Sequence, residues 1–249
     1  MRSRLGSSCL LLRSRERKRA VAAAFLRVIA MTTVFFDIDT QLDFLYPAGA
    51  LYVPKAERIV PNIARLNRFA AARGFPVVST TDAHTENDPE FSQWPPHCVA
   101  GTMGQRKPEA TLLERRVVIP SGADHRFSWS ANPEADLSGA DHRSSWSANP
   151  DPEFDAAQQI VFEKRTVDVF QCANLPALLR RLNAGQYVVY GVVTEICVLH
   201  AARGLLKTGI PVTVVTDAVE TLKAEDSARA LAEIRAGGGT LATVADICG

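Results

Sequence analysis

Cysteine is scarce in this sequence, and its few cysteines do not form a structural framework. They are Cys9, Cys98, Cys172, Cys197 and Cys248, an odd number without a C-x-x-C motif. A disulfide framework is therefore not expected, and we expect a reducing, cytoplasmic compartment. Long apolar runs are also missing. No stretch approaches the roughly 20 apolar residues of a membrane-spanning helix, so no membrane association is predicted.

The sequence also lacks a strong net charge, at +1, but its charges are unevenly distributed. Residues 1–30 contain eight lysines and arginines and one acid, whereas the remainder contains 20 basic and 26 acidic residues. Binding to the phosphates of a nucleic acid requires a basic surface. The acidic body of the chain therefore argues against a nucleic acid as the partner.

Residues 1–30 form an N-terminal extension that we separate from the fold. This segment is rich in arginine and serine and poor in acids, which is typical of a transit peptide. Met31, however, directly precedes the first strand pattern, and we favour Met31 as the natural start over a targeting role. The folded domain is predicted to span residues 31–249, a length that fits one α/β domain.

Strand patterns and helix patterns alternate along this domain. Apolar, β-branched runs predict strands at 32–39, 76–81, 159–163, 187–193, 212–216 and 241–244, with a short strand-like piece at 116–119. Helices are predicted from Ile59 to a stop at Gly74, and at 175–183, 195–208 and 224–236. Such alternation predicts a mostly parallel sheet of about six strands with helices on both faces, a Rossmann-like three-layer sandwich.

An internal repeat interrupts this alternation. Residues 121–133 read SGADHRFSWSANP and residues 138–150 read SGADHRSSWSANP. Two copies are too few for a solenoid, and small, turn-forming residues dominate both. The Asp-His pairs at 124–125 and 141–142 could ligate a metal, but a duplicated surface loop without that role is the favoured interpretation. We therefore predict a loop insertion at residues 121–152.

Reactive side chains follow several of the predicted strands. Asp39 ends the first strand, Asp82 follows the second, Lys164 follows the strand after the insertion, and Cys197 begins the helix after the 187–193 strand. In a parallel α/β sheet, ligands bind beyond the carboxyl ends of the strands. The sequence therefore predicts that these four side chains meet at one edge of the sheet.

These groups suffice for acyl transfer through a thioester. A helix N-terminus and a nearby ammonium from Lys164 would both lower the pKa of the Cys197 thiol. The Asp39 carboxylate could accept the thiol proton and later pass it to a leaving amine. Backbone N–H groups of Val193 and Cys197 could hold the oxyanion.

Three motifs in this order resemble those of the isochorismatase-like cysteine hydrolases. They are D-x-Q-x-D-F at residues 39–44, Lys164 after its strand, and GVVTEICV at residues 191–198. The resemblance covers residues 32–247 apart from the insertion, and it implies the fold predicted above. It further implies that Asp39, Lys164 and Cys197 form a catalytic triad, and that a cis peptide bond precedes Val193.

Two further segments resemble the nicotinamidase branch of that family. Residues 82–84 match its D-x-H motif, and residues 94–102, WPPHCVAGT, match its W-P-x-H-C-x-x-G-T segment. The resemblance implies hydrolysis of nicotinamide to nicotinate and ammonia in NAD salvage, with Phe44 and Trp94 against the pyridine ring. Residues 164–170, KRTVDVF, lack the glycine that nicotinamidases usually carry after the lysine, so related small amides remain candidate substrates.

On the same template, the chain is expected to bind one divalent ion, zinc, manganese or iron. The implied ligands are Asp82, His84 and His97, and two imidazoles with one carboxylate suit such ions. Three protein ligands leave open positions for water or substrate. A fourth protein ligand is predicted at Glu90, with Glu86 and Asp88 as rivals.

The sequence is also compatible with other functions. A haloacid-dehalogenase-type phosphatase would use Asp37 as nucleophile and Asp39 as acid, but its downstream acidic pair has no convincing match. A metal-independent relative could hydrolyse carbamoyl or ureido compounds with the same triad, and a non-catalytic binding protein could share the fold. For an isochorismatase-like hydrolase, the expected partner is a small-molecule amide substrate, and we expect a homo-oligomer.

Overall fold

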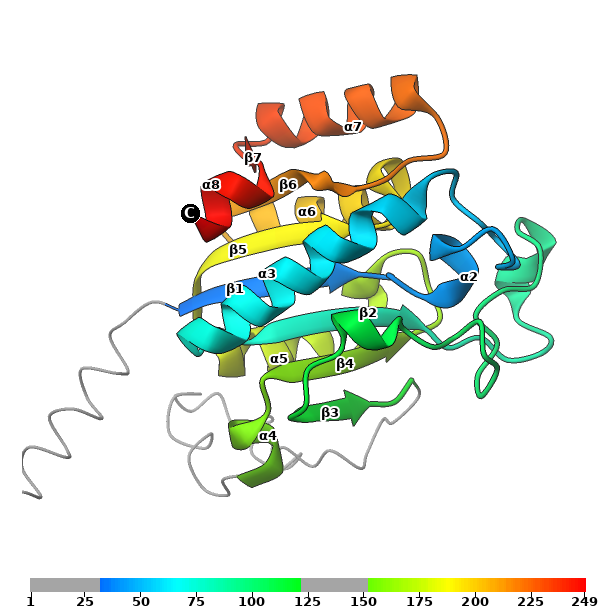
Figure 1. The fold of residues 1–249 in the computed structure, drawn as a ribbon, viewed down its shortest axis with the longest axis horizontal. Coiled ribbons are helices and arrows are strands. Elements are labelled where there is room, and N and C mark those ends of the chain that lie inside the picture. Colours follow the sequence, from blue (N-terminus) through cyan, green and yellow to red (C-terminus); the bar gives the residue numbers. More distant parts are fainter. Residues whose placement is uncertain (1–31, 122–151) are drawn as a thin grey trace, which may run out of the picture. The chain divides into compact units, whose positions relative to one another are not determined.

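The computed structural model describes residues 32–121 and 152–249, and these residues form one parallel sheet flanked by helices (Figure 1). The predicted N-terminal extension at 1–30 and most of the repeat insertion lie outside the described residues. The sheet contains seven strands in the order β3-β4-β2-β1-β5-β6-β7. The strands are β1 (Thr32–Ile38), β2 (Val77–Asp82), β3 (Arg116–Ile119), β4 (Gln159–Lys164), β5 (Ala184–Gly191), β6 (Val212–Val219) and β7 (Thr240–Ala242).

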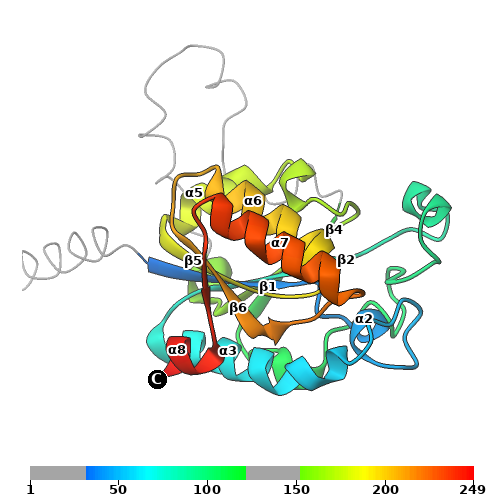
Figure 2. The same ribbon diagram turned by 90° about the horizontal axis from the view of Figure 1, so that it is seen from above.

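Helices cover both faces of the sheet, which confirms the predicted three-layer architecture. Figure 2 shows α3 and α8 on one face and α5, α6 and α7 on the other. The helices are α2 (Leu42–Leu45), α3 (Val60–Arg73), α4 (Pro152–Ala156), α5 (Leu175–Leu182), α6 (Leu199–Leu206), α7 (Ala224–Ala236) and α8 (Val244–Cys248). Short 3₁₀ turns lie at η1 (Ala56–Ile59), η2 (Pro89–Ser92), η3 (Glu109–Thr111) and η5 (Val169–Gln171).

Helix α3 illustrates how the sequence pattern produces this packing. Its apolar residues Ile63, Leu66 and Ala70 recur at helical spacing and are fully buried against the sheet. Pro61 lies in the first turn, where its missing N–H leaves no intrahelical bond unmade. Gly74 ends the helix in the left-handed conformation with φ of 69°, as predicted from its lack of a side chain.

The structure corrects several details of the prediction. The sheet has seven strands rather than about six, because the short piece at 116–119 pairs with β4 as an edge strand. Helix α5 ends as predicted, with Asn183 as its cap in the left-handed conformation at φ of 45°, but the next strand, β5, begins at Ala184 rather than at Tyr187. The predicted last strand is shorter, and a helix begins at Val244 instead.

No helix among the described residues is long and apolar enough to cross a membrane. The longest is α3, with 14 residues, and it presents one apolar face to the sheet and a charged face to solvent.

Candidate active site

The carboxyl ends of four strands bring the predicted reactive side chains together. Asp82 and Lys164 are the last residues of β2 and β4, and they are direct partners in the register of these neighbouring strands. Asp39 follows β1, and Cys197 lies one short turn beyond β5. All four side chains are buried. The topology therefore assembles at one edge of the sheet groups that are far apart in sequence.

Lys164 lies between two carboxylates. Its Nζ is 2.9 Å from Oδ2 of Asp39 and 2.5 Å from Oδ1 of Asp82. Burial lowers the pKa of Lys164, but the charges of Asp39 and Asp82 outweigh that effect and hold its pKa well above the ordinary value. The side chain is therefore a permanent ammonium in the centre of the site.

Asp39 is held by the neighbouring strand. Its backbone takes the left-handed conformation with φ of 50°, and its Oδ1 accepts a hydrogen bond of 2.7 Å from the Thr80 hydroxyl. Oδ2 faces Lys164 at ion-pair distance but outside hydrogen-bonding geometry, so it keeps an acceptor position. Burial raises the pKa of Asp39, and Lys164 only partly offsets this. A carboxylate with a raised pKa is suited to accepting a proton.

Cys197 lies in a single π-helical turn, η6 (Thr194–Val198), that leads directly into α6. We expected its thiol pKa to be lowered, and the structure shows the opposite. Burial raises the pKa well above the usual value, and although Lys164 lowers it, Asp39 and Asp82 raise it further. The thiol is therefore protonated before substrate binds, and a base must remove its proton.

The peptide bond between Val192 and Val193 is cis, as the family resemblance implied. Val193 is the residue before the π-helical turn, and the carbonyl of Val193 accepts hydrogen bonds from Ile196 and Val198. Amide groups in the first turn of a helix lack intrahelical acceptors. The amide of Val193 directly precedes this turn and the amide of Cys197 lies within it, and both remain the predicted donors of an oxyanion hole.

Asp82, His84 and His97 form a compact, buried cluster beside this triad. Their potential ligand atoms all lie within 4.8 Å of one another. Asp82 Oδ2 is 3.8 Å from His84 Nε2 and 3.9 Å from His97 Nε2, while its other oxygen faces Lys164. A short parallel bridge between His84 and Val99 brings the two histidine-bearing segments together.

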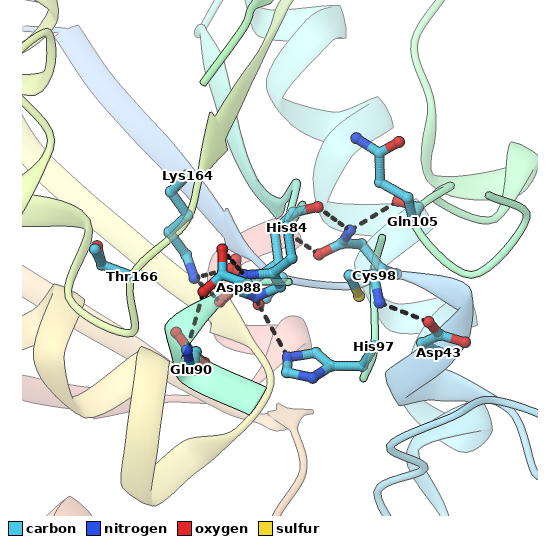
Figure 3. A network of polar contacts seen from close by, with 12 residues as sticks. Asp43, His84, Asp88, Glu90, His97, Cys98, Gln105, Lys164 and Thr166 are labelled. Carbon is cyan, nitrogen blue, oxygen red and sulfur yellow. Dashed lines mark hydrogen bonds and ion pairs between the residues drawn. The ribbon is translucent and has the colours of Figure 1, made fainter. Parts of the chain in front are cut away.

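The surroundings of both imidazoles fit a bound metal. His97 Nδ1 is 2.8 Å from the Pro95 carbonyl. Figure 3 shows Asp88 beside His84, whose Nδ1 is 3.1 Å from Oδ2 of Asp88. The Pro95 carbonyl holds His97 in the Nδ1–H tautomer, which directs its Nε2 toward a metal. Both ring nitrogens of His84 are buried without a hydrogen-bond partner among the described residues, which is costly unless an ion occupies the site.

The candidates for a fourth ligand occupy different places. Asp88 lies 3.1 Å from Nδ1 of His84 and is not part of the compact cluster. Glu86 is exposed. Glu90 lines the same pocket as Asp82 and His97, but its carboxylate is not part of the compact cluster. Burial and the charge of Asp82 raise the pKa of Glu90, which agrees with a carboxyl that faces the site.

An apolar pocket opens onto Cys197 and the metal cluster. The predicted aromatic residues Phe44 and Trp94 both line it. The remaining apolar wall was not predicted and comprises Leu51, Val53, Val167, Val192, Ile196 and Leu222. Several of these residues lie in loops without a period or motif, so no sequence pattern identifies them as pocket residues. Thr80 was also missed, because a hydroxyl within a buried strand resembles ordinary core sequence.

The structure does not support Asp37 as a nucleophile. Its carboxylate is fully buried on the other side of β1, where Lys107 Nζ lies 3.0 Å away. It also accepts hydrogen bonds from Thr40, Asn67 and Ser79. A fully buried carboxylate whose two oxygens are both engaged by protein donors cannot attack a substrate, so the phosphatase alternative loses its key residue.

Comparisons with known proteins agree with this geometry. The chain is 28% identical to a nicotinamidase of Escherichia coli over 231 residues, which cover 84% of this chain and 93% of the relative. Among solved structures, it resembles a Streptococcus mutans pyrazinamidase/nicotinamidase with a TM-score of 0.63 and 26% identity, covering 85% of this chain and all of the other. A zinc complex of Pyrococcus horikoshii pyrazinamidase has a TM-score of 0.62 and 25% identity, over 85% and 98% of the two chains.

The family model of the isochorismatase domain matches residues 33–120 and 116–246, which together include nearly all the described residues. The match spans β1 at one end and β7 at the other, and it includes every residue of the triad and of the metal cluster. The chain therefore belongs to the isochorismatase family of hydrolases.

Proposed function

We propose that this protein hydrolyses nicotinamide, or a closely related small aromatic amide, to the acid and ammonia through a thioester on Cys197. One observation carries the proposal: Cys197, whose thiol is close enough to Lys164 and Asp39 to feel both charges, lines an apolar pocket together with the two aromatic side chains Phe44 and Trp94. The similarity to nicotinamidases and pyrazinamidases supports this substrate class.

The first step forms the thioester. Asp39 takes the proton from the Cys197 thiol, and the sulfur attacks the amide carbon to form a carbon–sulfur bond. The raised pKa of Asp39 suits this transfer, and Lys164 stabilises the thiolate as it forms. The amides of Val193 and Cys197 hold the oxyanion. The carbon–nitrogen bond then breaks, and the proton on Asp39 passes to the leaving nitrogen, which departs as ammonia.

The second step regenerates the enzyme. Asp39 removes a proton from water, and the water oxygen attacks the thioester carbon. The carbon–sulfur bond breaks, the acid is released, and the proton returns to Cys197. Lys164 keeps its ammonium charge throughout, because the two flanking carboxylates raise its pKa well above neutrality.

Asp82, His84 and His97 would hold the divalent ion, and Glu90 lies in the pocket as a candidate further ligand. When bound, the ion would supply Lewis-acid chemistry in the pocket. Which metal binds follows from availability as well as donor chemistry, because two imidazoles and a carboxylate suit zinc, manganese and iron alike.

The pocket wall favours an uncharged, planar substrate. Phe44 and Trp94 offer ring faces, and Val167, Ile196 and Leu222 are aliphatic. No lysine or arginine lines the described pocket, so an anionic group on the substrate would find no counter-ion there.

We further propose a cytoplasmic role in NAD salvage and a homo-oligomeric state. The four cysteines of the described residues are free, as a reducing compartment requires.

An ammonia-release assay on nicotinamide tests the proposal. Wild-type protein is expected to release ammonia, and Cys197→Ala is expected to abolish release while remaining folded by circular dichroism. Treatment with a chelator is expected to lower the rate, and readdition of metal to restore it. Nicotinamide turnover that survives in Cys197→Ala would refute the thioester mechanism, and turnover that ignores chelation would favour a metal-independent relative.

A further inference from the structure

The segment at residues 39–44 does more than supply Asp39. Two of its polar side chains, Gln41 and Asp43, do not line the described pocket. Both are instead bonded to the backbone of the two segments that carry the metal cluster. We propose that Gln41 and Asp43 are positioning residues for the metal site, and that each clamps one ligand-bearing segment. This inference rests on the metal site of the proposed function.

Gln41 clamps the segment that carries Asp82. Its Oε1 accepts a hydrogen bond of 2.7 Å from the Asp82 N–H, and its Nε2 donates to the Asp82 carbonyl at 2.8 Å. The same Nε2 donates to the Gln105 carbonyl at 2.8 Å. The side chain is fully buried, so these bonds have no competition from water. The position requires one acceptor and two donors, which an amide provides and a carboxylate does not.

Asp43 clamps the segment that carries His97. Its Oδ2 accepts a hydrogen bond of 2.7 Å from the N–H of Cys98, the residue after His97 (Figure 3). Its Oδ1 accepts from the N–H of Ala50 at 2.9 Å. Both partners are donors, so the position requires two acceptors, and only a carboxylate provides them on a side chain of this size.

The backbone around Asp43 shows independently that the Asp43 carboxylate is held in one position. Cys98 takes the left-handed conformation with φ of 44°, which a residue with a side chain adopts only where its surroundings impose it. Gly104 passes so close to the Asp43 carboxylate that a Cβ there would lie 2.1–2.3 Å from its atoms. The chain therefore leaves one position for this carboxylate, and that position is bonded to the His97–Cys98 peptide.

Four variants test the two clamps. Asp43→Asn and Gln41→Glu keep the size of each side chain. The first replaces one acceptor oxygen by a donor NH₂ group, and the second replaces the donor NH₂ group by an acceptor oxygen. Gly104→Ala displaces the Asp43 carboxylate without changing Asp43. Asp217→Asn is the matched control, since Asp217 also joins distant segments by accepting a backbone hydrogen bond, from Val244 at 2.8 Å, but lies away from the metal cluster.

The readout is the dissociation constant for Zn²⁺, measured on the full chain by competition with a chromogenic chelator. Loss of a partner that supports metal ligands typically weakens metal affinity by about 10–100-fold. We expect losses in this range for Asp43→Asn, Gln41→Glu and Gly104→Ala, and a change below about threefold for Asp217→Asn. The visible spectrum of the Co²⁺-loaded protein is expected to change in the same three variants.

Two results would overturn the inference. One is wild-type affinity for Zn²⁺ in Asp43→Asn and Gln41→Glu together with lower thermal stability in both variants, because a purely structural role would lower stability alone. The other is a wild-type protein that binds neither Zn²⁺ nor Co²⁺. If that protein nevertheless hydrolyses nicotinamide, the proposed function stands without the metal clamps, so the two failures are distinguishable.

Discussion

The buried ion pair between Lys107 and Asp37 allows a stability prediction that is independent of catalysis. Both side chains are almost inaccessible to solvent, at 7% and 0% relative exposure, and their charged atoms are 3.0 Å apart. Lys107 lies in the long loop after β2, and it also donates to the Thr40 hydroxyl. The pair therefore ties this loop to the strand that precedes Asp39.

Replacing Lys107 by methionine keeps most of the side-chain volume and removes the charge. Asp37 then keeps the hydrogen bonds from Asn67, Ser79 and Thr40 but loses its counter-ion in a buried place. Removing one partner of a buried pair costs about 3–5 kcal/mol. For a domain of this size, each kcal/mol lowers the melting temperature by about 2–4 °C. Lys107→Met is therefore expected to lower Tm by about 6–20 °C.

Thermal unfolding followed by circular dichroism measures the shift in Tm. Urea denaturation followed in the same way measures the loss in the free energy of unfolding. A second variant, Asp37→Asn in the Lys107→Met background, removes the orphaned charge and is expected to recover part of the lost stability. Exposed Lys55→Met serves as the matched control, with an expected change within about 0.5 kcal/mol. A loss below about 1 kcal/mol in Lys107→Met would refute the view that the buried charge pair holds this loop.

Three substitutions test the site itself. Asp39→Asn removes the proposed base, and kcat on nicotinamide is expected to fall by about 10²–10⁴-fold in steady-state assays. Thr80→Val removes a hydrogen bond that lowers the pKa of Asp39, so the acidic limb of the kcat/KM profile is expected to move to higher pH, and an unchanged limb would contradict this role. Trp94→Ala removes one ring from the pocket, and a rise of about tenfold in KM is expected with a smaller change in kcat, corresponding to ~1.4 kcal/mol of binding.

The fold was largely predictable because its signals are local and repeated. The strands read as apolar runs, and α3 and α7 show helical periodicity with glycines at their ends. The missed helix α8 has only five residues, and its signal is the capping box of Thr243 and Asp246 rather than a period. The early start of β5 at Ala184 was missed because Gly185, a residue typical of breaks between elements, lies inside the strand.

The residues of the site were predictable from the sequence, but the shift in the pKa of Cys197 was not. The rule that ligands bind at the carboxyl ends of parallel strands brings Asp39, Asp82 and Lys164 together without any knowledge of distances. The raised pKa of Cys197 was not predictable, because it depends on the depth of burial and on two carboxylates at once. Likewise, no sequence pattern shows that Asp88 faces His84, since this contact depends on how the loop after β2 turns back.

The central claim is that Cys197 carries the acyl group of the substrate during turnover. Rapid acid quenching of the protein with nicotinamide, followed by intact mass spectrometry and peptide mapping, tests it most directly. The account predicts a mass gain of one nicotinoyl group on the peptide that contains Cys197, formed before the steady state and absent in Cys197→Ala. Turnover of nicotinamide without any such adduct, in wild-type protein and in Cys197→Ala alike, would contradict it.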